Sequence, residues 1–197
     1  MSITTGILLF PDAEELDFAG PWEVLTMAAM IVPGDRVVTI AETAAPVRCA
    51  KGLRVLPDHV LTDAPALDVL LVPGGVGTEQ VIANAPLVEW IRSVGAKATW
   101  VTSVCSGAGV LQAAGFLRGR QAATHWSYRD ALRGRGDVTV LEGPRYVRDG
   151  NVVTSAGVSA GIDMALWLVG QLHGPDIARR TQHFIEYNPA PPYAAEV

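Results

Sequence analysis

The sequence has few cysteines and no long hydrophobic run. Two cysteines in 197 residues are too few for a disulfide framework. No apolar run approaches the ~18–20 residues of a membrane span, and the first five residues lack the positively charged start of a signal peptide. We therefore expect a soluble cytoplasmic protein that keeps both thiols reduced and has no membrane partner.

Positive charge is also scarce. Lysine occurs only at Lys51 and Lys97, and the net charge is −5. This balance provides no basic surface for nucleic acid, so we expect the partner to be a small molecule. Hydrophobic residues make up 49% of the chain and charged residues 18%. A chain of this length and composition is predicted to form a single domain over residues 1–197.

Short apolar runs alternate with helical patterns along the chain. The apolar runs are nearly continuous, as expected for strands covered on both faces, and they span residues 6–10, 37–41, 69–72 and 98–102. Helices are predicted over residues 22–30, 81–94 (one or two helices, with Pro86 in a first turn), 110–116, 126–133, 159–173 and 176–186. A hairpin is predicted over residues 146–153 and an extended tail over residues 188–193. The alternation predicts an α/β fold with a mostly parallel, flavodoxin-like sheet sandwiched by helices.

Cys105 stands where a predicted strand gives way to a helix. Residues 106–109 are small, and a helix-compatible run follows them. This is the layout of a nucleophile elbow with cysteine in the place of serine. Such a turn brings the sulfur near free N–H groups at a helix N-terminus, which favours the thiolate. The alternative is a buried structural cysteine, and Cys49, which lies in a polar segment without an elbow, is assigned to that class.

Asp17 is the most informative acid in the loop after the first strand. Parallel sheets place ligands at the carboxyl ends of their strands, and Asp17 lies there between two apolar residues. It is interpreted either as the N-cap of the next helix or as a buried general acid that faces Cys105. The other acids of this loop are interpreted as solvated charges; they are Asp12, Glu14 and Glu15.

A glycine-rich segment, residues 73–77, follows the third strand. It fits a plain turn and lacks the complete pattern of a phosphate-binding or dinucleotide-binding loop. If the elbow is catalytic, the backbone N–H groups of Gly75 and Ser106 are candidates to stabilise charge on the attacked group, as an oxyanion hole does.

His125 and Trp126 are candidates for the wall of a pocket. His125 is interpreted either as a residue that orients or deprotonates the cysteine or as a structural histidine, and Trp126 fits a pocket wall or a core. The other histidines, at 59, 173 and 183, show no mutual spacing typical of metal ligands. We therefore expect no metal site and no cofactor.

Five segments together resemble the PfpI/ThiJ superfamily, the branch of class I glutamine-amidotransferase-like folds that has an elbow cysteine. They are residues 16–21 (LDFAGP), 71–75 (LVPGG), 104–107 (VCSG), 123–126 (ATHW) and 185–193 (IEYNPAPPY). The resemblance covers nearly the whole chain. Within the superfamily, the motifs are most similar to the isonitrile hydratases, whose elbow cysteine and aspartate match Cys105 and Asp17. The chain departs from that branch at Ser106, where threonine is typical.

The resemblance implies a homodimeric, cysteine-dependent hydratase that converts isonitriles into N-substituted formamides through a covalent thioimidate. Cys105 would attack the isonitrile carbon, Asp17 would donate a proton, and Ser106 and Gly75 would hold the polarised group. The alternatives are a glyoxalase- or deglycase-like enzyme in which His125 takes part, a small-molecule-sensing domain related to AraC-type regulators, and a redox sensor. We expect no helix-turn-helix segment after this domain, which argues against the regulator.

Overall fold

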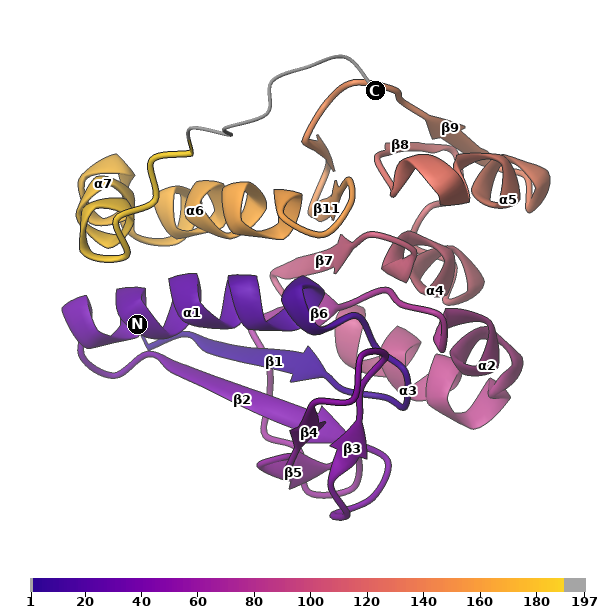
Figure 1. Cartoon of the computed structure of the whole chain (residues 1–197), viewed down its shortest axis with the longest axis horizontal. Helices are drawn as coiled ribbons and strands as arrows, with labels where there is room; N and C mark the ends of the chain where they lie inside the picture. The colour runs from indigo at the N-terminus through magenta and orange to yellow at the C-terminus, as the bar shows by residue number, and fades with distance from the viewer. Residues whose placement is uncertain (1, 190–197) are drawn as a thin grey trace.

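The computed structural model describes residues 2–189, and its centre is a seven-stranded sheet (Figure 1). Across the sheet, the strands are β10 (Tyr146–Asp149), β11 (Val152–Ser155), β7 (Trp100–Val104), β6 (Val69–Val72), β1 (Thr4–Leu8), β2 (Arg36–Ala41) and β5 (His59–Val60). Neighbouring strands are parallel, except that β10 and β11 form an antiparallel hairpin. Because β1, β6 and β7 are adjacent and parallel, the three loops that follow them meet at one edge of the sheet.

Two groups of helices flank this sheet (Figure 1). One group consists of α1 (Glu15–Ile31), α6 (Ala160–His173) and α7 (Pro175–Phe184), and the other of α2 (Thr78–Ala83), α3 (Ala85–Gly95) and α4 (Gly107–Ala113). The remaining elements are the strand pairs β3 (Val47–Arg48) with β4 (Arg54–Val55) and β8 (Arg120–Ala122) with β9 (Val138–Val140), the 3-10 turn η1 (Trp126–Tyr128) and α5 (Arg129–Gly134). The predicted α/β class, with a mostly parallel sheet between helices, is confirmed.

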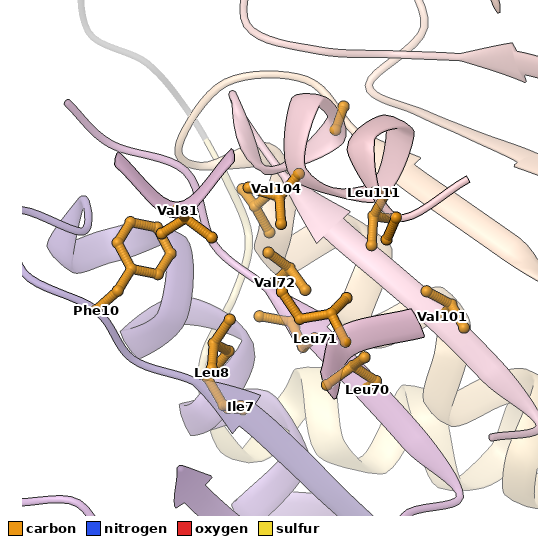
Figure 2. Packing of buried hydrophobic residues seen from close by; sticks show 14 of the residues in the cluster. Ile7, Leu8, Phe10, Leu70, Leu71, Val72, Val81, Val101, Val104 and Leu111 are labelled. Atoms are coloured by element: carbon orange, nitrogen blue, oxygen red, sulfur yellow. The ribbon is translucent and has the colours of Figure 1, made fainter. Parts of the chain in front are cut away.

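The inner strands are buried along their whole length because both of their faces are covered. Every residue of β1 and of β6 is buried. Figure 2 shows side chains from β1, β6, β7 and α4 in one apolar cluster, with Val72 of β6 close to Val104 of β7. Closely packed side chains of this kind are hard to displace. The cluster therefore fixes the positions of the strand ends and of the loops that follow them.

The start of α1 differs from the prediction. The sequence predicts a loop that ends at Pro21 and a helix over residues 22–30, whereas α1 begins earlier and continues through Pro21. Proline is disfavoured inside a helix because it lacks the N–H that bonds the carbonyl four residues before it. Packing compensates here: Pro21 lies against Gly161 of α6, and the neighbouring Gly20 lies against Ile162. The two glycines let the helices cross closely, which a local sequence pattern does not reveal.

The other predicted elements are present with shifted ends. The segment 81–94 divides into α2 and α3, with Pro86 in the first turn of α3. The predicted hairpin turns at Gly150, which has a φ of 64°. The short strands β3, β4, β5, β8 and β9 have no counterpart in the sequence-based prediction. Residues 190–193 of the predicted tail lie outside the described residues.

Gly107 provides a test of how tightly β6 and α4 are packed. A Cβ at this position would come within 2.4 Å of the Val72 carbonyl oxygen and 2.7 Å of the Pro73 carbonyl oxygen. Backbone atoms cannot move aside easily, so Gly107→Ala is expected to lower the free energy of unfolding by about 1–3 kcal/mol in urea denaturation. Gly134→Ala, at a glycine with no heavy atom within 4 Å of the added Cβ, is the control. Equal stability of the two variants would contradict the packing argument.

Candidate active site

The backbone at Cys105 has the strained conformation that the elbow pattern predicts. β7 ends at Val104, Cys105 has a φ of 57°, and α4 begins at Gly107. A positive φ is uncommon outside glycine and costs on the order of 1–3 kcal/mol. The Cys105 N–H donates a hydrogen bond to the Ala156 carbonyl oxygen at 2.9 Å. This bond anchors the elbow to the loop that follows β11.

Asp17 lies in the first turn of α1 and is completely buried, at 0% exposure. The N-cap position belongs to Glu14, so the helix-cap interpretation of Asp17 is wrong, because the helix begins earlier than predicted. Asp17 Oδ2 accepts a hydrogen bond from the Gly74 N–H at 2.9 Å. Oδ1 is buried and lacks an N–H or hydroxyl donor among the described residues. The Asp17 and Cys105 side chains are close enough for each to act on the pKa of the other.

Burial keeps protons on this pair. It raises the pKa of the Asp17 carboxyl to about 7, although the Gly74 N–H acts in the opposite direction. Burial, followed by the negative charge of Asp17, raises the pKa of the Cys105 thiol to about 12. Hydrogen bonds from the Ser106 backbone and hydroxyl lower the thiol pKa by less. The expectation of a resting thiolate is therefore wrong: the helix start does not outweigh desolvation and the adjacent carboxylate.

The Ser106 hydroxyl belongs to a small hydrogen-bond network. Its Oγ accepts the Gly75 N–H at 3.0 Å and lies 2.8 Å from Thr78 Oγ1. Thr78 Oγ1 in turn donates to the Gly75 carbonyl oxygen at 2.8 Å. This arrangement differs from the prediction that the Gly75 N–H faces a substrate, since that N–H already has an acceptor. The network holds the loop after β6 against the start of α4.

Cys105 opens into a pocket of about 400 Å³, within the range of roughly 300–1,000 Å³ typical of small-molecule sites. Ser106, Glu14, Glu79, His125 and Tyr128 are among the residues that line it. Asp17 lies behind the cysteine and not in the pocket wall. Trp126, predicted as a wall residue, does not line this pocket and is 71% exposed, because η1 turns its ring outward.

His125 forms part of the pocket wall as a neutral ring. Burial lowers its pKa, and the positive charge of Arg129 acts in the same direction. Its Nδ1 accepts the Ser127 N–H at 3.3 Å, so the proton of the neutral ring is assigned to Nε2. At Nε2 the ring is therefore a hydrogen-bond donor and not a base. His125 also caps η1, which is a backbone contact of the kind that the structural interpretation expects, and the residue lines the pocket as well.

A model of the DJ-1/PfpI family matches residues 4–171 of the chain. The chain belongs to the DJ-1/PfpI family. Isonitrile hydratase of Pseudomonas putida is 42% identical to it over 193 residues, which cover 98% of this chain and 82% of the hydratase. The glutathione-independent glyoxalase DJR-1.2 of Caenorhabditis elegans is 30% identical over 174 residues, covering 86% of this chain and 89% of the glyoxalase.

The crystal structure of a THiJ/PfpI family protein from Pseudomonas syringae superposes with a TM-score of 0.92 at 35% identity, covering 100% of this chain and 80% of that one. The resemblance drawn from the sequence motifs is thus confirmed at the level of the family and the fold.

The sequence analysis did not identify the two glutamates that line the pocket of this DJ-1/PfpI family member. Glu14 was grouped with Asp12 and Glu15 as a solvated charge, but the side chains of Glu14 and Glu15 are only 20% and 17% exposed. The signal that could have found Glu14 is its place between a buried alanine, Ala13, and the elbow-facing Asp17. Glu79 has no local signal, because only the packing of α2 against α4 brings it to the pocket.

Within residues 2–189, no group of three or more histidine, cysteine, aspartate or glutamate side chains is arranged to hold a metal ion. In the same part of the chain, no helix has the length and apolar character needed to cross a membrane.

The raised pKa of Asp17 predicts a pH dependence of stability. Because this pKa rises from 3.8 to about 7 on folding, the folded state binds more protons than the unfolded state between these values. The protonated Asp17 carboxyl therefore adds to the free energy of unfolding fully below about pH 4, and this contribution is lost as the pH rises through 7. The loss is on the order of 2–4 kcal/mol. The free energies of unfolding of the native protein and of Asp17→Asn, compared from pH 4 to 8, measure it. A difference that does not vary with pH would contradict the buried, protonated carboxyl.

Proposed function

We propose that this protein is a cysteine-dependent hydratase that converts small isonitriles into N-substituted formamides. The observation that carries the proposal is the buried Asp17 carboxyl beside the strained Cys105, which lines a pocket of about 400 Å³. The similarity to isonitrile hydratase over 98% of the chain supports the same reaction.

The protonated state of the pair suits the first chemical step. Adding a thiol to an isonitrile places both the sulfur and the proton on the same carbon. The proton must therefore be delivered to the carbon that the sulfur attacks, and we assign this relay to the Asp17 carboxyl, which neighbours the Cys105 thiol. The sulfur bonds to the terminal carbon, the thiol proton passes through the Asp17 carboxyl to that carbon, and a thioimidate, S–CH=N–R, results.

Hydrolysis completes the reaction. Water adds to the thioimidate carbon, the carbon–sulfur bond breaks, and the formamide leaves with the thiol restored. The hydrogen bonds from Ser106 lower the pKa of the Cys105 thiol, so they favour the departing sulfur as it gains negative charge. Gly75 acts through Ser106, since its N–H holds the Ser106 hydroxyl in place. The homodimer implied by the family resemblance stays a prediction that sedimentation at micromolar concentration can test.

A glyoxalase-like activity is the second candidate. The similarity to DJR-1.2 and the position of His125 in the pocket wall favour it. The assignment of the His125 proton to Nε2 argues against a glyoxalase-like mechanism in which His125 is the base. A protonated Nε2 donates a hydrogen bond and cannot accept a proton.

The purified protein is expected to turn over an aryl isonitrile, followed by absorbance, with the formamide identified by chromatography. Cys105→Ala is expected to fold normally, because the change removes only one sulfur atom next to the pocket. The variant is expected to lose turnover completely, because it lacks the nucleophile. A native protein that consumes methylglyoxal and leaves isonitriles intact would favour the glyoxalase-like function. Binding of either compound without any turnover would favour a sensing domain.

Asp17→Asn separates an acid–base role from a positional one. Asparagine keeps the size of the side chain and an acceptor for the Gly74 N–H, but it cannot exchange a proton. Isonitrile turnover is expected to fall by ~10²–10⁴-fold, measured at the pH optimum of the native protein. A folded Asp17→Asn variant with full activity would contradict the proton-transfer role.

A further inference from the structure

Two carboxylates face the pocket, and they differ in how their oxygens are occupied. Both oxygens of Glu79 have donors: Oε1 accepts the Tyr128 hydroxyl at 2.7 Å and Oε2 accepts the Arg135 guanidinium at 2.5 Å. Glu14 pairs through Oε1 with the Lys51 ammonium. From the described part of the chain, Glu14 Oε2 receives no hydrogen bond. Glu14 is therefore the pocket carboxylate with an oxygen available to a water molecule.

The backbone holds Glu14 close to the reacting pair. Its N–H donates to the Gly74 carbonyl oxygen at 2.9 Å, and the N–H of the same Gly74 donates to Asp17. The negative charge of Glu14 acts to raise the pKa of both Asp17 and His125. Glu14 and Cys105 line the same pocket, so the Glu14 carboxylate and the reacting sulfur share one space.

The turn between β3 and β4 clamps the segment that carries Glu14. The Ala50 N–H donates to the Ala13 carbonyl oxygen at 2.9 Å, and the Lys51 N–H donates to Glu15 Oε1 at 2.6 Å. The Lys51 ammonium contacts Glu14 and lies 3.8 Å from Glu15 Oε2. Lys51, one of two lysines in the chain, therefore fixes the direction of the Glu14 side chain.

Hydrolysis of a thioimidate needs a base that touches a water molecule in the pocket. Asp17 is fully buried and does not line the pocket, His125 presents a donor at Nε2, and each oxygen of Glu79 already accepts a hydrogen bond. We propose that Glu14 is the general base of the hydrolytic half-reaction and that Lys51 is the residue that positions it. This inference rests on the proposed hydratase function.

In this step, Glu14 Oε2 accepts one proton from water while the water oxygen bonds to the thioimidate carbon. Glu14 returns that proton to the nitrogen, which gives a tetrahedral intermediate, S–CH(OH)–NH–R. Formation of the C=O bond breaks the carbon–sulfur bond, and the hydroxyl proton passes to the departing sulfur. The products are the formamide and the Cys105 thiol, so the sum is one isonitrile plus one water.

Glu14→Gln tests the proposal directly. Turnover of an aryl isonitrile is expected to fall by about 10²-fold through kcat, while the covalent thioimidate accumulates. Intact-protein mass spectrometry during turnover would then show an added mass equal to that of the isonitrile on Cys105. Glu15→Gln is the matched control, because Glu15 shares the Lys51 contact but does not line the pocket; it is expected to show no accumulated adduct.

Lys51 variants test the positioning role. Lys51→Met is expected to lower kcat by up to about 10²-fold and to accumulate the same adduct, whereas Lys51→Arg, which keeps the charge, is expected to restore most of the turnover. Glu14→Gln with native turnover and no adduct would overturn the assignment while leaving the hydratase function intact. Equal losses of turnover in Glu14→Gln and Glu15→Gln would also overturn the assignment of Glu14 as the base. Both losses would then reflect only the ion pairs with Lys51. A native protein without isonitrile turnover would overturn the hydratase function and this inference together.

Discussion

The close approach at Gly74 is the constraint on which the whole site depends. Its N–H holds the Asp17 carboxylate, and its carbonyl oxygen receives the Glu14 N–H. A Cβ at this position would lie 2.6 Å from the Ser106 nitrogen and 2.9 Å from the Cys105 Cβ. No side chain fits there. A single glycine thus joins the loop after β1, the loop after β6 and the elbow after β7, and it does so at the edge where three parallel strands end.

Burial at this junction sets the protonation state of the site. A carboxyl with one backbone donor and no exposure gains little from solvation, so it keeps its proton up to about pH 7. The same desolvation acts on the thiol beside it. In the resting site, Cys105 is therefore a neutral thiol and Asp17 a neutral carboxylic acid, and the two do not form an ion pair. That arrangement favours reactions that deliver sulfur and hydrogen to one carbon, which is what an isonitrile requires.

Two kinds of acidic group meet around the pocket: a buried, protonated pair and two charged carboxylates. Asp17 and Cys105 are both buried. Glu14 and Glu79 are anchored from outside by Lys51 and Arg135, which carry the balancing positive charges. Acids that lie close together in one small site can thus have different protonation states.

Local pattern was sufficient for the elbow, the alternation of strands and helices, and the family, because each depends on neighbouring residue types. Backbone strain at Cys105 follows from a strand that stops at a small-residue turn, and the buried strands follow from continuous apolar runs. The start of α1 was not predictable, because Pro21 is tolerated only where α6 offers Gly161 for contact. The resting thiol and the inward position of Glu14 were not predictable either. The protonated thiol depends on desolvation, and the position of Glu14 depends on Lys51. Segments distant in the sequence create both conditions only when the chain has folded.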